Sequence, residues 1–380
     1  MSFSDIINFM ISAGRKNLQT ELDLYFEQKG TDGVSRQAFS KARENVNPQA
    51  ICELNERVSK KLEKTMELKT YQGYRLISVD GTILDLPNNE NLKDHFGYAS
   101  NSTNITHCAA LGMVIYDLLN HISLTGELYS YFDSEKKRIL EIADRLKERE
   151  TLKNPLFILD RGYPSFDLMC KFAENNQKYL IRVSRQTLKE ISSVNTEDEI
   201  VHITRKGKAI QVRVVTITLN TGNVEKIVTN VFEKFDISQI KELYAKRWGI
   251  ETNYHYIKNV QLLECFTGES VNAILQDFYV SLLIMNIAVP FYKEQKDILN
   301  HNQENKTFEY NPSLSELIYK IKIDYMKFLS KKRQSHNLIK EYFRYKNIMK
   351  FAYAVIPNRT NPRKYSNTYD HRKAHIKKLL

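Results

Sequence analysis

Two aspartates follow apolar segments of this 380-residue chain at places where chemistry is expected. Asp80 follows YRLISV, and Asp160 follows PLFIL. Both segments predict short strands, and ligands of open α/β sheets bind beyond the carboxyl ends of strands. An acid at such a position is well placed to hold a metal ion. For either residue alone, a turn-forming or helix-capping aspartate is the commoner role.

A third carboxylate lies in a segment that predicts one long helix over 239–260, opened by Ser238. With a turn of about 100° per residue, four polar side chains of this helix fall within roughly 60° of one another. They are Tyr244, Arg247, Glu251 and Lys258. The alternative is a solvated face on which Arg247 and Glu251 pair, which contributes only about 0.2–0.5 kcal/mol.

Together, two strand-end aspartates and a helical glutamate indicate a two-metal site. Oxygen ligands select Mg²⁺ or Mn²⁺ over zinc. Two such ions about 3.5–4 Å apart activate an attacking oxygen and stabilise a leaving oxygen during an in-line displacement. The expected chemistry is therefore metal-dependent phosphoryl transfer.

The same residues carry a family resemblance. Tyr244, Arg247, Glu251 and Lys258 form the pattern Y-x₂-R-x₃-E-x₆-K within YAKRWGIETNYHYIK. The chain resembles bacterial insertion-sequence DDE transposases of the insertion sequence 4 type, for which this Y-R-E-K pattern is a signature. The segments SVDGTILDLP, LDRGYPSFDL and SRQAFSKAR are also similar to that family, so the likeness covers residues 35–290.

This resemblance implies a ribonuclease H-like catalytic domain with a β-rich insertion between the second aspartate and the glutamate. It implies that Asp80, Asp160 and Glu251 are the catalytic ligands of two Mg²⁺ (or Mn²⁺) ions. It also implies that Tyr244, Arg247 and Lys258 hold DNA phosphates, as a phenol donor and two cations can. Trp248, the only tryptophan, either stacks on an unpaired base or anchors the core.

The implied activity is cleavage at the terminal inverted repeats of a mobile element and strand transfer into target DNA. The resemblance further implies a hairpin intermediate and a homodimer on double-stranded DNA. Two alternatives stay open: an inactive or domesticated DNA-binding relative, and a ribonuclease H-like nuclease without strand transfer.

The pattern of elements predicts an α/β fold flanked by helical N- and C-terminal regions. We expect a helical DNA-binding region over 1–70, a catalytic domain over 71–295 with its insertion at 185–235, and a helical region over 296–380. Alternating short apolar strands and amphipathic helices support the catalytic domain. The expected strands are 74–80, 83–86, 107–118, 155–160 and 178–183, and the expected helices are 134–150 and 164–175.

The N-terminal region predicts helices over 5–28, 36–44 and 49–66, with Ser35 capping the second. We expect three cations of this region to bind the DNA backbone, namely Arg36, Lys41 and Arg43. Arg182 and Arg185, before the insertion, are either further DNA contacts or surface cations.

Positive charge is concentrated at the C-terminal end. Residues 331–380 hold fourteen Lys or Arg and two acids, a net charge of +12, whereas the other 330 residues hold 42 basic and 43 acidic side chains. Such a block favours phosphate, and nucleic acid is the expected partner. The cations Lys331, Lys332, Arg333, Arg363 and Lys364 would bind backbone; the alternative is a solvated tail that aids solubility.

Other features exclude competing classes. The four cysteines form no C-x-x-C pair, so neither a zinc site nor a disulfide framework is indicated. Residues 1–22 contain charged side chains and no apolar core typical of a signal peptide. The apolar run 273–292 is interrupted by polar residues and a proline, which favours a buried helix over a membrane span. We therefore expect a cytoplasmic protein at the bacterial nucleoid, without a membrane.

Overall fold

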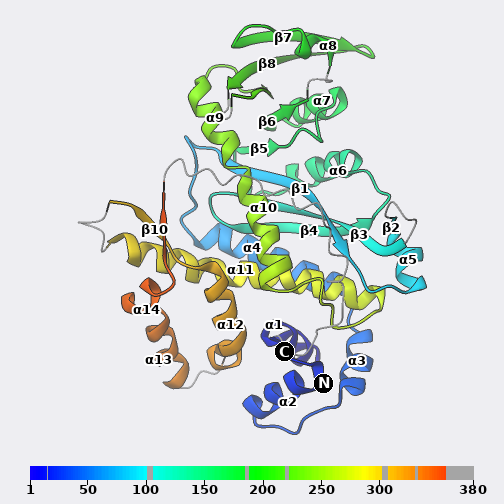
Figure 1. The fold of residues 1–380 in the computed structure, drawn as a ribbon, viewed down its shortest axis with the longest axis vertical. Coiled ribbons are helices and arrows are strands. Elements are labelled where there is room, and N and C mark those ends of the chain that lie inside the picture. Colours follow the sequence, from blue (N-terminus) through cyan, green and yellow to red (C-terminus); the bar gives the residue numbers. More distant parts are fainter. Residues whose placement is uncertain are drawn as a thin grey trace. The chain divides into compact units, whose positions relative to one another are not determined.

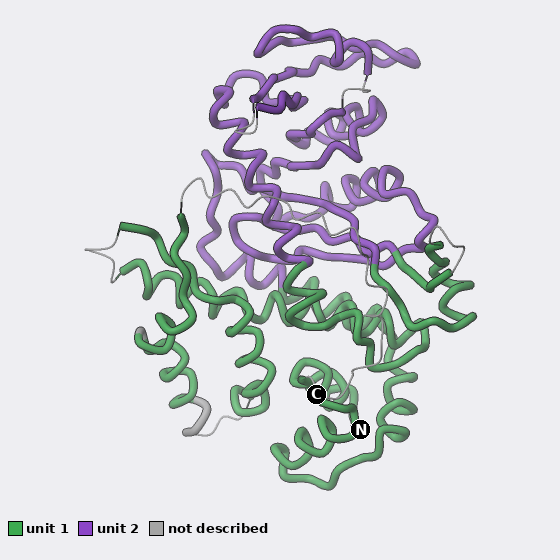
Figure 2. The backbone as a smooth tube through the Cα atoms, viewed as in Figure 1, with its two compact units in different colours: residues 1–58, 84–110, 255–380 green, residues 59–83, 111–254 purple. Residues whose placement is uncertain are grey.

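The computed structural model describes two compact units of the chain, which Figure 2 colours separately. The described residues are 1–14, 16–100, 106–184, 188–218, 222–301, 307–329 and 333–356. Unit 1 comprises residues 1–58, 84–110 and 255–380, and unit 2 comprises residues 59–83 and 111–254. Each unit combines segments that are distant in sequence, so the linear division into three regions stays a prediction.

Unit 2 is built on a mixed sheet (Figure 1). The strand β1 (Arg75–Asp85) pairs in parallel with β5 (Pro155–Leu159), and β5 pairs in parallel with β6 (Lys178–Val183). On the other side of β1 lies β3 (Thr106–Asp117), which also pairs with β4 (Ile122–Ser130). The expected mixed α/β architecture is confirmed.

Burial explains why these segments are strands. From Cys108 to Asp117 every side chain of β3 is buried, as expected for a strand that is covered on both faces. The two strands expected at 74–80 and 83–86 are one continuous strand, β1, whose Leu84 is buried in the core. The strand β4 was not predicted, since its buried Ser123 and Thr125 obscure the apolar pattern.

The β-rich insertion continues this sheet. The strands β7 (Asp198–Arg205), β8 (Lys208–Thr218) and β9 (Val224–Thr229) pair antiparallel, and β9 pairs antiparallel with β6. Lys206 and Gly207, both at positive φ, close the two-residue turn between β7 and β8. This antiparallel meander lies within the insertion expected at 185–235, and its backbone hydrogen bonds to β6 make it the edge of the same sheet.

Amphipathic helices accompany the strands of unit 2. In α6 (Glu135–Lys147) one stripe of side chains is buried, formed by Ile139, Ile142, Ala143 and Leu146. This helix packs against α7 (Phe166–Glu174), whose N-cap is Ser165. The short helix α8 (Lys189–Ser192) precedes the meander.

The long helix expected over 239–260 is interrupted. It consists of α9 (Ile237–Ala245), α10 (Trp248–His255) and a π-helical turn η1 (Tyr256–Val260). Between α9 and α10, backbone N–H groups donate to the carbonyl three residues earlier instead of four, as in a 3₁₀ turn. An example is Arg247 N–H to Tyr244 C=O. Asp236, not Ser238, caps α9. Angles calculated for one continuous helix therefore do not hold beyond residue 245.

Unit 1 is mostly helical. Its long helix α11 (Val271–His301) contacts α1 (Phe3–Ser12), α3 (Arg36–Glu44) and α12 (Leu314–Leu329). The helix expected over 5–28 is two helices, because Asn17 caps α2 (Leu18–Lys29). The remaining elements are α4 (Pro48–Thr65), which continues into unit 2, α5 (Glu90–Phe96), β2 (Tyr98–Ser100), β10 (Glu309–Asn311), α13 (Arg333–Tyr342), α14 (Tyr345–Met349) and β11 (Tyr353–Val355).

By length and composition α11 could cross a membrane. However, 72% of its most apolar window is buried within the structure. Its buried side chains include Gln276 and Asn286, which hydrogen-bond to Arg43 and Asn55. The helix therefore serves as a core helix, as the interrupted apolar run predicted.

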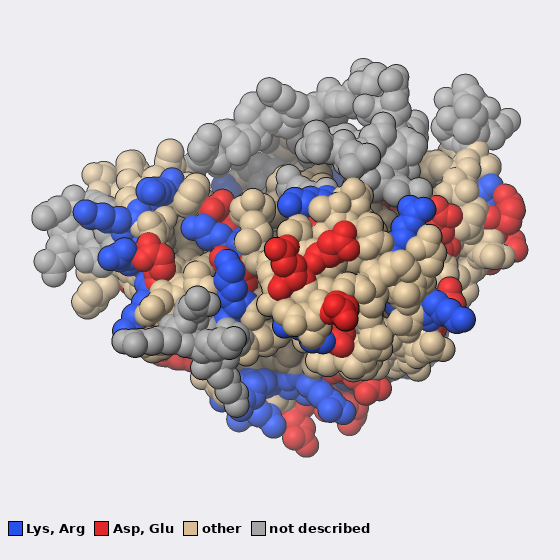
Figure 3. Space-filling view, turned by 90° about the horizontal axis from the view of Figure 1, so that it is seen from below, with Lys and Arg blue, Asp and Glu red and all other residues tan. Residues whose placement is uncertain are grey.

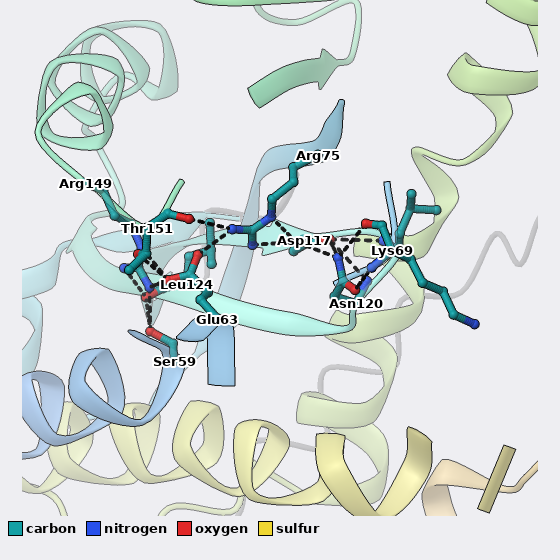
Figure 4. A network of polar contacts seen from close by, with 10 residues as sticks. Ser59, Glu63, Lys69, Arg75, Asp117, Asn120, Leu124, Arg149 and Thr151 are labelled. Atoms are coloured by element: carbon teal, nitrogen blue, oxygen red, sulfur yellow. Dashed lines mark hydrogen bonds and ion pairs between the residues drawn. The ribbon is translucent and has the colours of Figure 1, made fainter. Parts of the chain in front are cut away.

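A buried ionic network surrounds Arg75, the first residue of β1 (Figure 4). The guanidinium of Arg75 donates to Asp117 and to Glu63, and the Arg149 guanidinium donates to the other oxygen of Glu63. The Glu63 and Asp117 side chains are 0% exposed. Each buried charge thus has a hydrogen-bonded partner of opposite charge, which burial requires.

Candidate active site

The two aspartates lie on neighbouring strands of the unit 2 sheet. Asp160 directly follows β5, as predicted, whereas Asp80 is in the middle of β1 rather than at its end. The Glu135 carboxylate lies close to this part of β1: a Cβ at Gly81 would be 2.5 Å from the Glu135 carboxyl carbon, so a larger residue there would displace the end of that side chain.

Arg247 connects all three predicted acids. Its Nη2 lies 2.8 Å from Glu251 Oε1 and 4.0 Å from Asp160 Oδ2, and its Nη1 lies 4.0 Å from Asp80 Oδ2. The arginine is only 5% exposed, and its buried Nε has no hydrogen-bond partner in the described part of the chain. The structure thus brings Asp80, Asp160 and Glu251 together around one guanidinium.

Asp160 has further partners. Its Oδ1 accepts hydrogen bonds from the Tyr244 hydroxyl at 3.1 Å and from Arg182 Nε at 3.0 Å. Arg182 also pairs with Glu225 on β9, so the insertion strand that pairs with β6 contributes to the surroundings of the second acid. Tyr244 is buried, and its hydroxyl is directed at a carboxylate.

The two aspartates have opposite electrostatic environments. Burial raises the pKa of Asp80 to about 7; the Arg247 charge opposes this, and Glu135 and Asp160 add to it. Burial also acts to raise the pKa of Asp160, but the Arg161 backbone N–H and the Arg247 and Arg182 guanidinium groups lower it below its ordinary value. At neutral pH the second acid is therefore ionised, whereas the first is poised to exchange a proton.

Sequence reasoning missed three residues near Asp80. The Tyr254 hydroxyl donates to the Asp80 carbonyl oxygen at 2.6 Å. Glu135, at the first turn of α6, accepts a 2.6 Å hydrogen bond from the Tyr163 hydroxyl and acts on the Asp80 charge. Tyr254 could have been noticed, because it follows Glu251 by three residues on one helix face. Nothing in the sequence marks Glu135.

The remaining residues of the Y-R-E-K segment divide between the units. Trp248 is 51% exposed, so a role as a core anchor is wrong, and the Arg247 guanidinium lies 5.5 Å from its ring centroid. Lys258 belongs to unit 1, where it forms an ion pair with Glu264 at 3.0 Å.

The acids have the right chemistry for a metal ion, since Mg²⁺ and Mn²⁺ take carboxylate oxygens. Among the residues that the structure describes, no three His, Cys, Asp or Glu side chains come close enough to share an ion. The Arg247 guanidinium lies between the three carboxylates instead. The carboxylates therefore have the donor chemistry of a divalent-ion site, but in this structure they surround an arginine side chain.

The N-terminal cations differ from one another. Arg36 and Lys41 are exposed, whereas Arg43 is 4% exposed and donates to Gln276, Thr267 and Asp277. In this structure the Arg43 guanidinium joins α3 to α11, so a contact of Arg43 with DNA would require it to leave these partners. On the face drawn in Figure 3, Lys and Arg side chains stand among Asp and Glu side chains. Outside the described part of the chain lie Arg185 and the side chains of the five C-terminal cations expected to bind backbone, Lys331, Lys332, Arg333, Arg363 and Lys364.

Comparison with known proteins defines the class. Residues 71–287, more than half of the chain, match the sequence model of the family described as Transposase DDE domain. The protein therefore belongs to the DDE transposase domain family. This match spans all three acids, and the resemblance to transposases of the insertion sequence 4 type is confirmed.

Particular relatives are distant. The chain is 24% identical over 272 residues to "Transposase InsG for insertion sequence element IS4" of Escherichia coli, covering 64% of this chain and 60% of that protein. It is 24% identical over 284 residues to "Putative transposase for insertion sequence element IS4SA" of Synechocystis, covering 71% and 77%. A piggyBac transposase synaptic complex with hairpin DNA matches 97% of this chain and 78% of that chain, with 10% identity and a TM-score of 0.44.

Proposed function

We propose that this protein is a DNA transposase that cleaves the terminal inverted repeats of a mobile element and transfers the free ends into target DNA. The observation that carries the proposal is the convergence of Asp80, Asp160 and Glu251 on one buried guanidinium. The three carboxylates face one cation from different elements, and in a DDE family member such acids would serve metal-dependent phosphoryl transfer.

We infer a ribonuclease H-like catalytic core. The strand order β4-β3-β1-β5-β6 supports it, with the first acid on the central strand and the second at the end of its parallel neighbour. The insertion between the second aspartate and the glutamate then supplies β7, β8 and β9, and Glu225 on β9 holds the Arg182 that contacts Asp160.

In this mechanism Asp80, Asp160 and Glu251 would hold two Mg²⁺ or Mn²⁺ ions. Bound there, the ions would activate the attacking oxygen and stabilise the leaving oxygen. Tyr244 and Arg182 orient Asp160 and keep it ionised. Arg247 turns from the acids to a DNA phosphate, which suits its bidentate fork. The exposed ring of Trp248 stacks on an unpaired base, and Lys258 binds a phosphate as a point charge.

The partner is double-stranded DNA, held by the exposed cations Arg36 and Lys41 and by the basic C-terminal residues. Two element ends must be joined, so the protein acts as a homodimer on DNA, through a hairpin at the element end, in the bacterial cytoplasm at the nucleoid. Because phosphate contacts release counterions, affinity for DNA should fall steeply with salt. A salt-insensitive affinity would contradict this part of the proposal.

The deciding experiment is an excision assay in cells. The sequences that flank the gene bracket a selectable marker, and wild-type protein is compared with Glu251→Gln, which keeps the side-chain shape but removes the charge. We expect excision by the wild type alone, with DNA binding by both. Binding without excision by either would point to an inactive or domesticated relative. Cut ends that never join target DNA would point to a nuclease without strand transfer.

A further inference from the structure

A buried phenol joins the strand of the first acid to the helix of the third. The Tyr254 hydroxyl donates to the Asp80 carbonyl oxygen at 2.6 Å and accepts the Val114 N–H at 3.0 Å. The Tyr254 side chain is on α10 and is 7% exposed. One side chain thus contacts the backbone of β1 and of β3 at the position of Asp80.

The register of the two strands makes this contact unusual. The Leu118 N–H donates to the Leu76 carbonyl at 2.9 Å, so Asp80, four residues after Leu76, faces Val114, four residues before Leu118. In an antiparallel ladder alternate pairs exchange hydrogen bonds, and this register gives Asp80 and Val114 the place of such a pair. The Tyr254 hydroxyl accepts the Val114 N–H and donates to the Asp80 carbonyl, so a side chain bridges the two strands at the residue that carries the first acid.

Glu251 is on the same helix, one turn before Tyr254. Side chains three residues apart are neighbours on a helix surface. One turn of α10 therefore carries Glu251 and, through Tyr254, hydrogen-bonds to the backbone of Asp80. We propose that Tyr254 is a positioning residue that fixes the separation of Asp80 from Glu251, so that both can bind one cation. This inference rests on the proposed function, because it assumes that the acids share a metal ion.

Tyr254→Phe tests the hydroxyl alone. The ring keeps its packing, and the freed Val114 N–H can bond to the Asp80 carbonyl directly, so the fold should persist while Asp80 shifts. Groups that orient metal ligands typically alter metal affinity by about 10–100-fold when removed. We expect Mn²⁺ binding to weaken by about tenfold or more, whereas the melting temperature and metal-free DNA binding change no more than in a control.

A suitable control is Tyr342→Phe in unit 1. Tyr342 is also 7% exposed and also donates a hydrogen bond, to Asp324 at 3.1 Å, but it belongs to α13. Mn²⁺ binding to the full-length protein without DNA is followed by electron paramagnetic resonance for the wild type, both tyrosine variants and Glu251→Gln. Loss of Mn²⁺ affinity in Tyr254→Phe but not in Tyr342→Phe is the expected result.

Two outcomes would overturn the inference, and they are distinguishable. If Glu251→Gln loses Mn²⁺ but Tyr254→Phe binds it like the wild type, the acids hold the metal without help from the phenol, and only the positioning role fails. If Glu251→Gln also binds Mn²⁺ like the wild type, the assigned metal site fails and the role of Tyr254 fails with it.

Discussion

Arg247 Nη2 lies 2.8 Å from Glu251 Oε1, and the same guanidinium is 4.0 Å from a carboxylate oxygen of Asp80 and of Asp160. One cation therefore stabilises three acids whose negative charges would otherwise repel one another at close range. At the proposed metal site, a divalent ion and the Arg247 guanidinium would therefore compete for the same carboxylate oxygens.

Replacing Arg247 should therefore strengthen metal binding in the absence of DNA. For Arg247→Gln we expect Mn²⁺ affinity to rise about tenfold, on the order of 1.4 kcal/mol, because the acids lose their resident cation. Isothermal titration calorimetry measures this directly. Lys246→Gln is the matched control, since Lys246 is adjacent but pairs with Glu242 instead. Equal or weaker Mn²⁺ affinity in Arg247→Gln would show that the arginine does not compete.

Removing the charge of Glu63 should destabilise the fold. Glu63 accepts from both Arg75 and Arg149 in the buried network of Figure 4, so Glu63→Gln leaves two buried guanidinium groups without their shared partner. Breaking a buried ion pair on one side costs about 3–5 kcal/mol. Urea unfolding should show a loss of this size, whereas Glu141→Gln, which removes a surface pair with Arg138, should change stability by less than about 1 kcal/mol.

The same residue predicts a pH dependence. Burial acts to raise the pKa of Glu63, but the Arg149 charge and hydrogen bonds from Arg149, Thr151 and Arg75 lower it below its unfolded value of 4.5. A lowered pKa stabilises the folded state above the unfolded pKa, and this contribution is lost as pH falls below it. The difference in unfolding free energy between wild type and Glu63→Gln should therefore be constant above pH 5 and shrink below pH 4.5. A difference that grows with acidity would reverse the assigned direction.

Residue type and spacing predicted the chemistry of the site better than its geometry. Short apolar runs predicted the strands β1, β5 and β6, and Asp160 follows β5 as expected. The angles predicted for one continuous helix over 239–260 do not hold beyond Ala245. The helix is interrupted there by a turn with hydrogen bonds to the third preceding residue, which the residue types do not indicate. Glu135 and Tyr254, which lie near Asp80, were not predicted. They approach it through tertiary packing of segments that are distant in sequence, and spacing along one sequence does not reveal such packing.

Lys41 and Arg43, two residues apart on α3, should respond differently to substitution. Lys41 is exposed, so Lys41→Ala should weaken DNA binding and reduce the slope of log affinity against log salt by about one, as expected for the loss of one phosphate contact. Arg43 is buried and donates to Gln276 and Asp277, so Arg43→Ala should lower the unfolding free energy by about 3–5 kcal/mol, because the Asp277 carboxylate loses its cation and keeps only hydrogen bonds from Thr267.

Thermal unfolding and a salt series of DNA-binding titrations, made on both variants, separate the two roles. Loss of stability in the Arg43 variant, with an unchanged salt slope while it stays folded, would establish that this arginine joins α3 to α11. A reduced salt slope in that variant would instead mean that its guanidinium leaves the core to reach phosphate. An unchanged slope in Lys41→Ala would remove this face of α3 from the DNA-binding surface.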